Sequence, residues 1–383
     1  MFLIRTINVE KMLKHDKNLI EDGVNMKRLT KKAKIVIGTV GLALLLLAIL
    51  LIINIISKKD NSKVDEQEPK NEIKEELPIK KLQIMDLNSN SRSYAVMINN
   101  HSSARAHHAG LQDAYLIYEI IVEGGLTRYM AIFKDQDTAK IGSVRSSRHY
   151  FLDYAMENDA IYVHWGWSPQ AQNDISEYKI NNINGLTWEG TYFYRDKSLN
   201  VSSEHTGFTT MEMLKKGASR LGYRTTSNEQ PLLNYEVDEI DNSNLATIPA
   251  TTVTIKYSSS VTDKYVYDET NKVYKRYVNN KEHVDDVTKK QYTFKNIITY
   301  QVANSSIKGD NKGRQDIANI GKGSGYYISN GVAVKINWEK TSRQSKTIYT
   351  YEDGTPLKVN DGNTFIQIQP KNQTLKIEGS SNE

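Results

Sequence analysis

An uninterrupted apolar run near the amino end constrains this chain more than any other feature. Residues 35–56 hold 22 amino acids without a charge, and apart from glycines only Thr39 and Asn54 interrupt the apolar side chains. A helix of that length spans about 33 Å, enough to cross the hydrocarbon core of a bilayer. A buried core helix normally shows polar periodicity, which this run lacks. The run therefore predicts a single transmembrane helix.

Basic residues are distributed unequally around this run. Five precede it, Lys27, Arg28, Lys31, Lys32 and Lys34, whereas Lys58 and Lys59 follow it. The positive-inside bias places residues 1–34 in the cytoplasm and the rest of the chain outside the cell membrane. A cleaved signal peptide that starts at Met26 is the alternative, and translation from Met1 or Met26 stays open. No small-x-small cleavage site follows the run, which favours an uncleaved anchor.

Charge and cysteine content exclude several classes of protein. Residues 1–34 hold nine Lys/Arg against four Asp/Glu, which equals the formal charge of +5 of the whole chain, so residues 35–383 sum to zero. A non-specific nucleic-acid binder needs a basic excess in its folded part, so no nucleic-acid partner is expected. The chain has no cysteine. Disulfides, thiol catalysis, cysteine-ligated zinc and a lipid-modified cysteine are therefore excluded.

Changes in composition indicate how the remaining chain is organised. Residues 57–81 hold seven lysines, seven acids and two prolines, typical of a solvated linker. Residues 82–229 mix strand and helix patterns, residues 230–250 are a polar connection, and residues 251–374 show strand patterns throughout, before a tail at 375–383. The predicted class is α+β: a mixed α/β amino-terminal exterior domain, followed by a smaller β-rich domain.

Local signals predict the individual elements. In the first domain the expected strands are 94–98, 115–122, 127–133 and 160–164, and the expected helices are 147–157, one that starts at Ser168-Pro169, and 210–221. In the second domain, strands 252–257, 265–267, 273–278, 293–302 and 365–369 accompany a hairpin at 326–338 that turns at Asn330-Gly331. Ser168 suits a helix cap, and Thr209 with Glu212 suits a capping box. The segment 321–325, Gly-Lys-Gly-Ser-Gly, lacks phosphate-loop spacing and predicts a hairpin entry.

Four arginines are the candidate ligand-binding residues: Arg128, Arg145, Arg148 and Arg195. Guanidinium groups suit phosphate and carboxylate better than any other side chain. Arg145 and Arg148 are three residues apart at the predicted start of a helix, where free backbone N–H groups favour an anion. The alternative is structural pairing with acids such as Asp153, Asp196 or Glu123.

Two acids and one histidine complete the candidate site. Glu119 and Glu123 are four apart on a predicted strand, about 13 Å from each other, which is too far for a carboxylate dyad. Either could hold a metal, although a buried ion pair is the favoured role of Glu119. His164 ends a strand just before Trp165-Gly166-Trp167, and either an acid–base role or a hydrogen-bonded structural role fits it. No histidine spacing matches a zinc motif, and the two tryptophans suit sugar stacking or core packing equally.

Three motifs together resemble those of the YerB-like proteins, a bacterial family of cell-envelope lipoproteins without an established biochemical function. They are Glu-Gly-Gly-Leu-Thr-Arg at 123–128, Gly-Ser-Val-Arg-Ser-Ser-Arg at 142–148, and His164; the resemblance resumes at 325–331 and 361–365. It implies a two-domain envelope protein with no confirmed reaction. Family members often carry a lipid-modified cysteine, so here the transmembrane helix would replace it, and a proline is common where Ser143 stands.

These features lead to two functional hypotheses. In the first, a membrane-anchored, extracytoplasmic envelope protein binds a phosphate-bearing wall polymer or its lipid-linked precursor through the four arginines. Were it an enzyme, His164 or Glu123 would be the acid or base, with magnesium at Glu119 or Glu123, in hydrolysis or transfer at a phosphoester. In the second, a non-catalytic scaffold binds envelope proteins through edge strands and tyrosines such as Tyr326 and Tyr327. The sequence leaves open whether the protein is an enzyme and which cofactor it uses.

Overall fold

The structure is a computed structural model that describes residues 82–242 and 244–379. The predicted cytoplasmic segment 1–34, the apolar run 35–56 and the linker 57–81 lie outside the described residues. Among the helices that are described, none is long and apolar enough to cross a membrane. The described residues belong to one compact unit.

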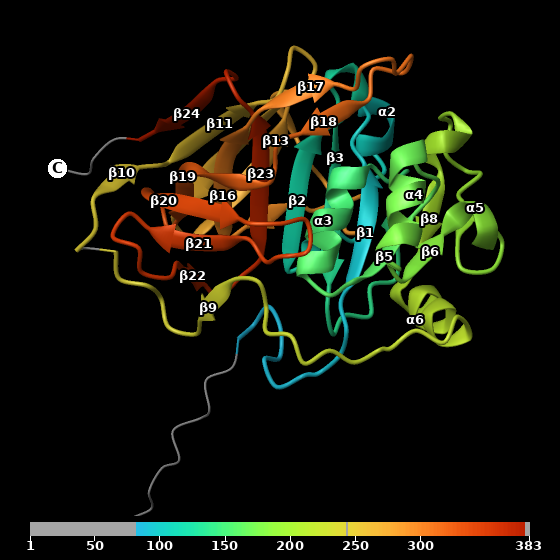
Figure 1. Ribbon diagram of the computed structural model, residues 1–383. Coiled ribbons are helices and arrows are strands. Elements are labelled where there is room, and N and C mark those ends of the chain that lie inside the picture. The colour runs from blue at the N-terminus through green and yellow to red at the C-terminus, as the bar shows by residue number, and fades with distance from the viewer. Residues whose placement is uncertain (1–81, 243, 380–383) are drawn as a thin grey trace, which may run out of the picture. The chain divides into compact units, whose positions relative to one another are not determined.

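A mixed sheet of eleven strands runs through the described part of the chain (Figure 1). In spatial order it contains β10 (Thr247–Pro249), β20 (Val332–Lys340), β19 (Gly321–Ser329), β16 (Asn296–Val302), β23 (Thr364–Pro370), β2 (Leu116–Ile121), β3 (Thr127–Phe133), β1 (Tyr94–Asn99), β5 (Ile161–His164) and β6 (Asn182–Asn184), and β21 (Ile348–Tyr351) pairs with β20.

The amino-terminal and carboxy-terminal halves join at the centre of this sheet. Strand β2 pairs in parallel with β23, with Ile117 opposite Phe365. Every residue of both strands is buried, as parallel pairing with both faces covered requires. Each large apolar side chain buried there contributes about 1.5–3 kcal/mol of stabilisation. The two halves therefore share one core rather than packing as separate bodies.

A second sheet of six strands covers one face of the carboxy-terminal half. It contains β14 (Lys281–Glu282), β13 (Val273–Val278), β12 (Thr262–Asp268), β11 (Thr252–Lys256) and β24 (Leu375–Glu378), with β15 (Thr293–Phe294) paired to β13. Alternate residues of β13 are buried, as expected for a strand with one face toward the core. The Tyr257 hydroxyl donates to the Glu119 carbonyl of β2 over 3.0 Å, which ties the two sheets together.

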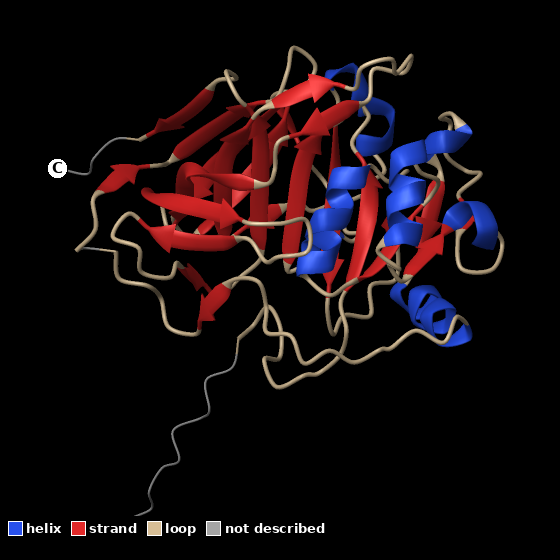
Figure 2. Cartoon of the chain, viewed as in Figure 1, coloured by secondary structure: helices blue, strands red, loops and turns tan. Residues whose placement is uncertain are grey.

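The helices gather beside the amino-terminal strands (Figure 2). They are α2 (Ser102–Arg105), α3 (His149–Glu157), α4 (Pro169–Glu177), α5 (Gly185–Trp188) and α6 (Met211–Arg220), with 3-10 turns η4 (Leu111–Asp113), η5 (Glu123–Gly125) and η6 (Ser203–His205). Small sheets join β4 (Ile141–Gly142), β8 (Gly207–Thr209) and β7 (Tyr194–Arg195), β17 (Asn304–Ser306) with β18 (Gln315–Ile317), and β22 (Lys358–Asn360) with β9 (Asn234–Glu236). The predicted mixture of α and β structure, with a β-rich carboxy-terminal part, is confirmed.

Most helix caps and turns lie where the sequence predicted them, with two corrections. The Ser168 side chain caps α4, and Asn330-Gly331 turns the β19–β20 hairpin with positive φ at both residues. The cap of α6 is Thr210, one residue later than predicted, because the Thr209 hydroxyl instead donates to the Tyr192 carbonyl. Helix α3 begins at His149, so Arg145 precedes the helix and does not share a helical face with Arg148.

Candidate functional site

The carboxyl ends of three parallel strands, β1, β5 and β6, lie along one edge of the main sheet. An extended segment inserts between the first two, since the Arg145 N–H donates to the Met97 carbonyl over 2.9 Å and the Trp165 N–H donates to the Arg145 carbonyl over 3.0 Å. The peptide bond between Gly142 and Ser143, just before this segment, is cis. Ligands of open α/β sheets commonly bind at the carboxyl edge of parallel strands.

Two buried arginines share one carboxylate at this edge. Arg128 Nη2 lies 3.0 Å from Glu123 Oε1, and Arg148 Nε lies 2.9 Å from Glu123 Oε2, with a second contact from Arg148 Nη2. Burial alone would raise the pKa of Glu123, but the hydrogen bonds from Arg148 and the charge of Arg128 outweigh it and lower the pKa to about 2. Glu123 is therefore ionised at neutral pH and bound through both oxygens, which makes it a poor general base.

Positive charge exceeds negative charge around this pair. Burial, together with the neighbouring charges of Arg148 and Arg145, lowers the pKa of Arg128, whereas Glu123 opposes the shift. Both buried guanidiniums also donate to backbone carbonyls, Arg128 to Ser146 and Arg148 to the preceding residue, each over 2.6 Å. These two arginines therefore fix the segment that carries Arg145 and leave a local surplus of positive charge.

Of Arg128, Arg145 and Arg148, Arg145 is the most exposed to solvent. Its side chain is 25% exposed, and its Nη2 lies 2.5 Å from Oε2 of Glu204, whose own side chain is 51% exposed. A half-exposed ion pair of this kind contributes little to stability and exchanges readily with water or another anion. Arg145 is thus the guanidinium that a bound anion could recruit.

Two stacked histidines border Arg145. The His205 ring lies 4.6 Å from that of His101, with the planes 11° apart. The Asn99 amide nitrogen lies 2.8 Å from His205 Nδ1, which assigns the ring proton to Nε2, 3.6 Å from a Glu204 oxygen. Burial lowers the pKa of His205, although Glu204 opposes it, so the imidazole is neutral at pH 7. A neutral imidazole with its N–H toward the edge can donate a hydrogen bond to an anion held by Arg145.

Arg195, at the end of β7, contacts the turn at residues 203–205. Its Nε lies 2.9 Å from Glu189, its guanidinium covers the Trp165 ring at 4.3 Å, and it donates to the carbonyl of Ser203, the first residue of η6. Trp165 is buried between Gly185 and Gly207, whose missing side chains make room for the ring. Core packing therefore accounts for Trp165, and Arg195 borders the turn that carries Glu204.

His164 lies inside the protein. Its Nδ1 lies 2.8 Å from the Gly166 carbonyl and its Nε2 lies 3.1 Å from Asn182 Oδ1. The residue is fully buried, and burial lowers its pKa. The hydrogen-bonded structural role fits this environment, and the acid–base role has no support in it.

Glu119 belongs to a buried ionic network. Its Oε2 lies 2.8 Å from Arg276, and its Oε1 accepts from the Thr127 hydroxyl over 2.6 Å. Burial and the nearby Asp263 raise the pKa of Glu119, although Arg276 opposes the shift. Within residues 82–242 and 244–379, no group of three or more His, Asp or Glu side chains could hold a metal ion. The magnesium hypothesis therefore has no ligand cluster around Glu119 or Glu123 in this part of the chain.

Sequence reasoning did not select Glu204, His205 or Asn99 for this site. Glu204 and His205 reach Arg145 because β4 pairs with β8, with Gly142 opposite Phe208, which brings the 203–205 turn to the edge. Asn99 ends β1 and contacts His205. No spacing between residues in the sequence indicates that contact. The one available signal was His205 itself, a histidine that follows an acid in a turn.

Comparisons with known proteins agree on one family. Residues 82–224 match the family model described as "Protein of unknown function (DUF3048) N-terminal domain", and residues 253–366 match the corresponding C-terminal domain model. The chain is 31% identical to "Putative lipoprotein YerB" of Bacillus subtilis (strain 168) over 283 residues, which cover 73% of this chain and 81% of that protein.

A solved structure gives the same result. The crystal structure of the Bacillus subtilis YerB protein superimposes with a TM-score of 0.67 at 27% identity, and the match covers 77% of this chain and 99% of that chain. By sequence and by structure, the chain belongs to the DUF3048 family, the family of YerB.

Proposed function

We propose that this protein is an extracytoplasmic component of the cell envelope, held at the membrane, that binds a phosphate-bearing wall polymer or its lipid-linked precursor. The apolar run at 35–56 supports the anchor, and a relative named as a lipoprotein supports the same location by a different attachment. Since this chain has no cysteine to carry a lipid, the apolar run takes over that role.

One observation carries the ligand class: three guanidiniums, Arg128, Arg145 and Arg148, gather at one edge with two carboxylates, Glu123 and Glu204, of which Glu204 is half exposed. The guanidiniums of Arg128 and Arg148 already bind Glu123 and backbone carbonyls. These two arginines therefore hold the edge in place and supply positive potential. Arg145 is the contacting residue, because its partner Glu204 is half exposed and displaceable. The His205 N–H adds a neutral donor beside it. Such a set of donors without an available base fits binding of a phosphate group rather than its hydrolysis.

One of the two tyrosines that the scaffold hypothesis relies on is buried. Tyr327 is 1% exposed, and its hydroxyl donates to Asn296 Oδ1 over 2.9 Å, so it cannot present a surface to a partner. Tyr326 is partly buried. No further observation favours protein recognition by this face.

Replacing Arg145 with alanine should weaken binding of pyrophosphate and of glycerol phosphate oligomers about tenfold or more, since a charge-assisted contact is lost. The free energy of unfolding should change by less than about 1 kcal/mol, because the lost ion pair is half exposed. Calorimetry on a fragment of residues 77–383 measures the first, and urea unfolding measures the second.

The matched control is Arg220→Ala, an exposed arginine at the end of α6. It removes the same charge away from the edge and should leave affinity unchanged. Equal affinities in the parent, Arg145→Ala and Arg220→Ala fragments would refute a phosphate site at this edge.

A further inference from the structure

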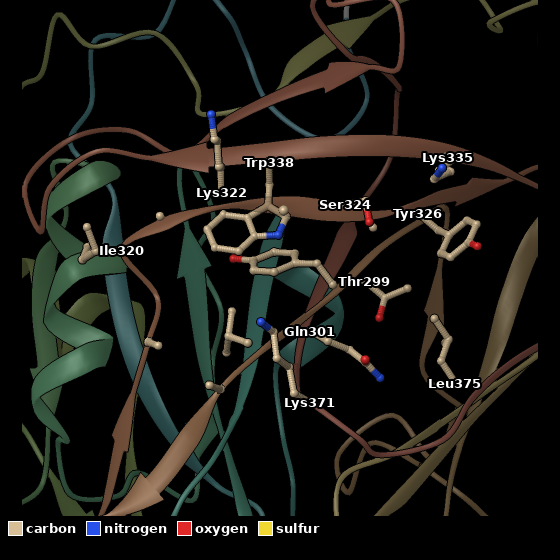
Figure 3. A pocket seen from close by; sticks show the side chains of 17 residues that line it. Thr299, Gln301, Ile320, Lys322, Ser324, Tyr326, Lys335, Trp338, Lys371 and Leu375 are labelled. Atoms are coloured by element: carbon tan, nitrogen blue, oxygen red, sulfur yellow. The ribbon is translucent and has the colours of Figure 1, made fainter.

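The two ends of the β19–β20 hairpin differ in the lysines that lie beside them. At the open end, residues 321–325 form the predicted hairpin entry and border a cleft of about 540 Å³ (Figure 3). The lysines that line this cleft, Lys322, Lys335 and Lys371, are exposed to solvent. At the closed end, the turn at Asn330-Gly331 instead packs against a lysine that is largely buried, Lys295.

Three side chains from distant segments meet at this turn. Lys295, between β15 and β16, places its Nζ 2.5 Å from Oδ1 of Asn330 and 3.8 Å from Oε1 of Glu239. Hydrogen bonds from Lys272 and from the Asn330 side chain lower the pKa of Glu239, so this carboxylate is ionised at neutral pH. An amine, a side-chain amide and a carboxylate are therefore in mutual contact.

Two lysines pair with Glu239, but their environments differ. Lys272 lies 2.7 Å from Oε2 of Glu239, its side chain is 55% exposed, and Glu239 raises its pKa. The Lys295 side chain is only 16% exposed, and burial lowers its pKa, although Glu239 opposes the shift. The neutral amine is the nucleophilic form of lysine, so burial favours Lys295 as the nucleophile.

The backbone holds both contacting residues in place. The Lys295 N–H donates to the Asn363 carbonyl over 3.1 Å, and a Cβ at Gly362 would lie 2.4 Å from the Lys295 Cβ. Asn330 has a φ of 52° in the tight turn of the hairpin. An amine and an amide that are fixed side by side react as if each were at very high concentration.

We propose that Lys295 and Asn330 form an intramolecular isopeptide bond, with Glu239 as the group that carries the proton. Glu239 takes a proton from the Lys295 ammonium, and the Nζ lone pair then attacks Cγ of Asn330. The Nζ–Cγ bond forms, the Cγ–Nδ2 bond breaks, and Glu239 relays a proton from Nζ to the leaving nitrogen. The net products are one secondary amide and one ammonium ion, and no oxidant or cofactor takes part.

The surroundings suit this reaction and give it a use. A cleft of about 630 Å³ is lined by Glu239 and Asn330, so ammonia has a path to solvent. The bond closes the chain between positions 295 and 330, which joins the start of β16 to the β19–β20 turn. Proteins outside the cytoplasm often use disulfides for such links, and this chain has no cysteine. The three residues lie outside the arginine edge, so the inference does not depend on the proposed ligand.

Mass spectrometry of the full-length protein, purified and then denatured, tests the proposal. The chain should be lighter than its sequence requires by the mass of one ammonia molecule. Trypsin should release one branched species that joins residues 291–308, uncleaved after Lys295, to residues 323–335. An intact mass equal to that of the sequence, with free peptide 296–308 in the digest, overturns the proposal.

Three variants assign the roles. Lys295→Arg and Asn330→Gly should each restore the full mass, and glycine keeps the positive φ that the turn needs. Glu239→Gln should slow the reaction about a hundredfold, so freshly made protein should be mostly unlinked. The control Lys275→Arg changes an exposed lysine that pairs with Asp268, and it should leave the bond complete. Complete linkage in freshly made Glu239→Gln would overturn the role of Glu239.

An asparagine followed by glycine can also lose ammonia by another reaction, in which the Gly331 backbone nitrogen attacks Cγ and forms a succinimide. That product leaves the Lys295 amine free, so trypsin still cleaves after it. The succinimide would also persist in Lys295→Arg, whereas the isopeptide bond cannot. A loss of ammonia that remains in Lys295→Arg therefore overturns the proposal, and a loss that disappears there supports it.

Discussion

Replacing Arg276 with methionine is expected to lower the free energy of unfolding by about 3–5 kcal/mol. The guanidinium is fully buried between the two sheets, 2.8 Å from Glu119 of β2 and 2.7 Å from Asp263 of β12. Burial disfavours its charge, but Asp263 and Glu119 outweigh that effect and raise the pKa of Arg276. Without it, two buried carboxyl groups lose the cation that they share. Urea unfolding of the 77–383 fragment, followed by circular dichroism, measures the loss.

The matched control is Lys275→Met, the preceding residue of β13. Its side chain is 44% exposed and pairs with Asp268, so the change should stay below about 1 kcal/mol. Adding Glu119→Gln to Arg276→Met should recover part of the loss, because one unpaired buried carboxyl is removed. An Arg276→Met fragment as stable as the parent would mean that this network does not hold the sheets together.

A chain of hydrogen bonds leads from Arg276 toward the candidate site. Arg276 Nη1 lies 2.7 Å from His283 Nδ1, His283 Nε2 lies 2.7 Å from His108 Nδ1, and His108 Nε2 lies 2.5 Å from the Asn99 carbonyl. Burial lowers the pKa of both histidines, so each is neutral and passes one N–H along the chain. Asn99 in turn donates from its side chain to His205. The network between the sheets thus orients a residue of the arginine edge.

The alternation of β13 places Arg276 on the buried face of its strand. Tyr274, Arg276 and Val278 share that face, and all three are buried. The pattern shows which residues face inward, but it cannot show that Glu119, more than 150 positions earlier, supplies the opposite charge. That pairing follows from the packing of the six-stranded sheet against β2, a contact between segments far apart in the chain.

The sequence identified the arginine motifs, but it could not show what each arginine contacts. Glu123 and Arg128 sit at the two ends of one tight turn between β2 and β3, so their proximity follows from the hairpin. Which arginine stays partly exposed depends on the segment 143–148, which inserts between β1 and β5. For the same reason His164, for which the sequence left both an acid–base role and a structural role open, lies buried against the Gly166 carbonyl. Local patterns determined the elements, and contacts between distant segments determined the site.

Replacing Glu123 with glutamine is expected to lower the free energy of unfolding at pH 7 by about 3 kcal/mol, because two buried guanidiniums lose their shared anion. The matched control is Glu204→Gln, which removes a carboxylate from the half-exposed pair with Arg145. That change should cost less than about 1 kcal/mol. Equal, small losses in both variants would mean that the Glu123 contacts contribute no more than a surface ion pair.

The pH dependence of stability isolates the same carboxylate. The pKa of Glu123 is lowered from 4.5 to about 2 in the folded protein, so its contribution is complete above pH 4.5 and is lost as the pH falls toward 2. A shift of this size corresponds to about 3 kcal/mol. The gap in stability between the parent and Glu123→Gln should therefore be widest at pH 7 and close progressively below about pH 5. Urea unfolding at pH 7, 5, 4 and 3 follows the gap, and the subtraction removes the titration of every other acid. A gap that stays constant across this range would show that the two arginines do not hold Glu123 in its ionised form.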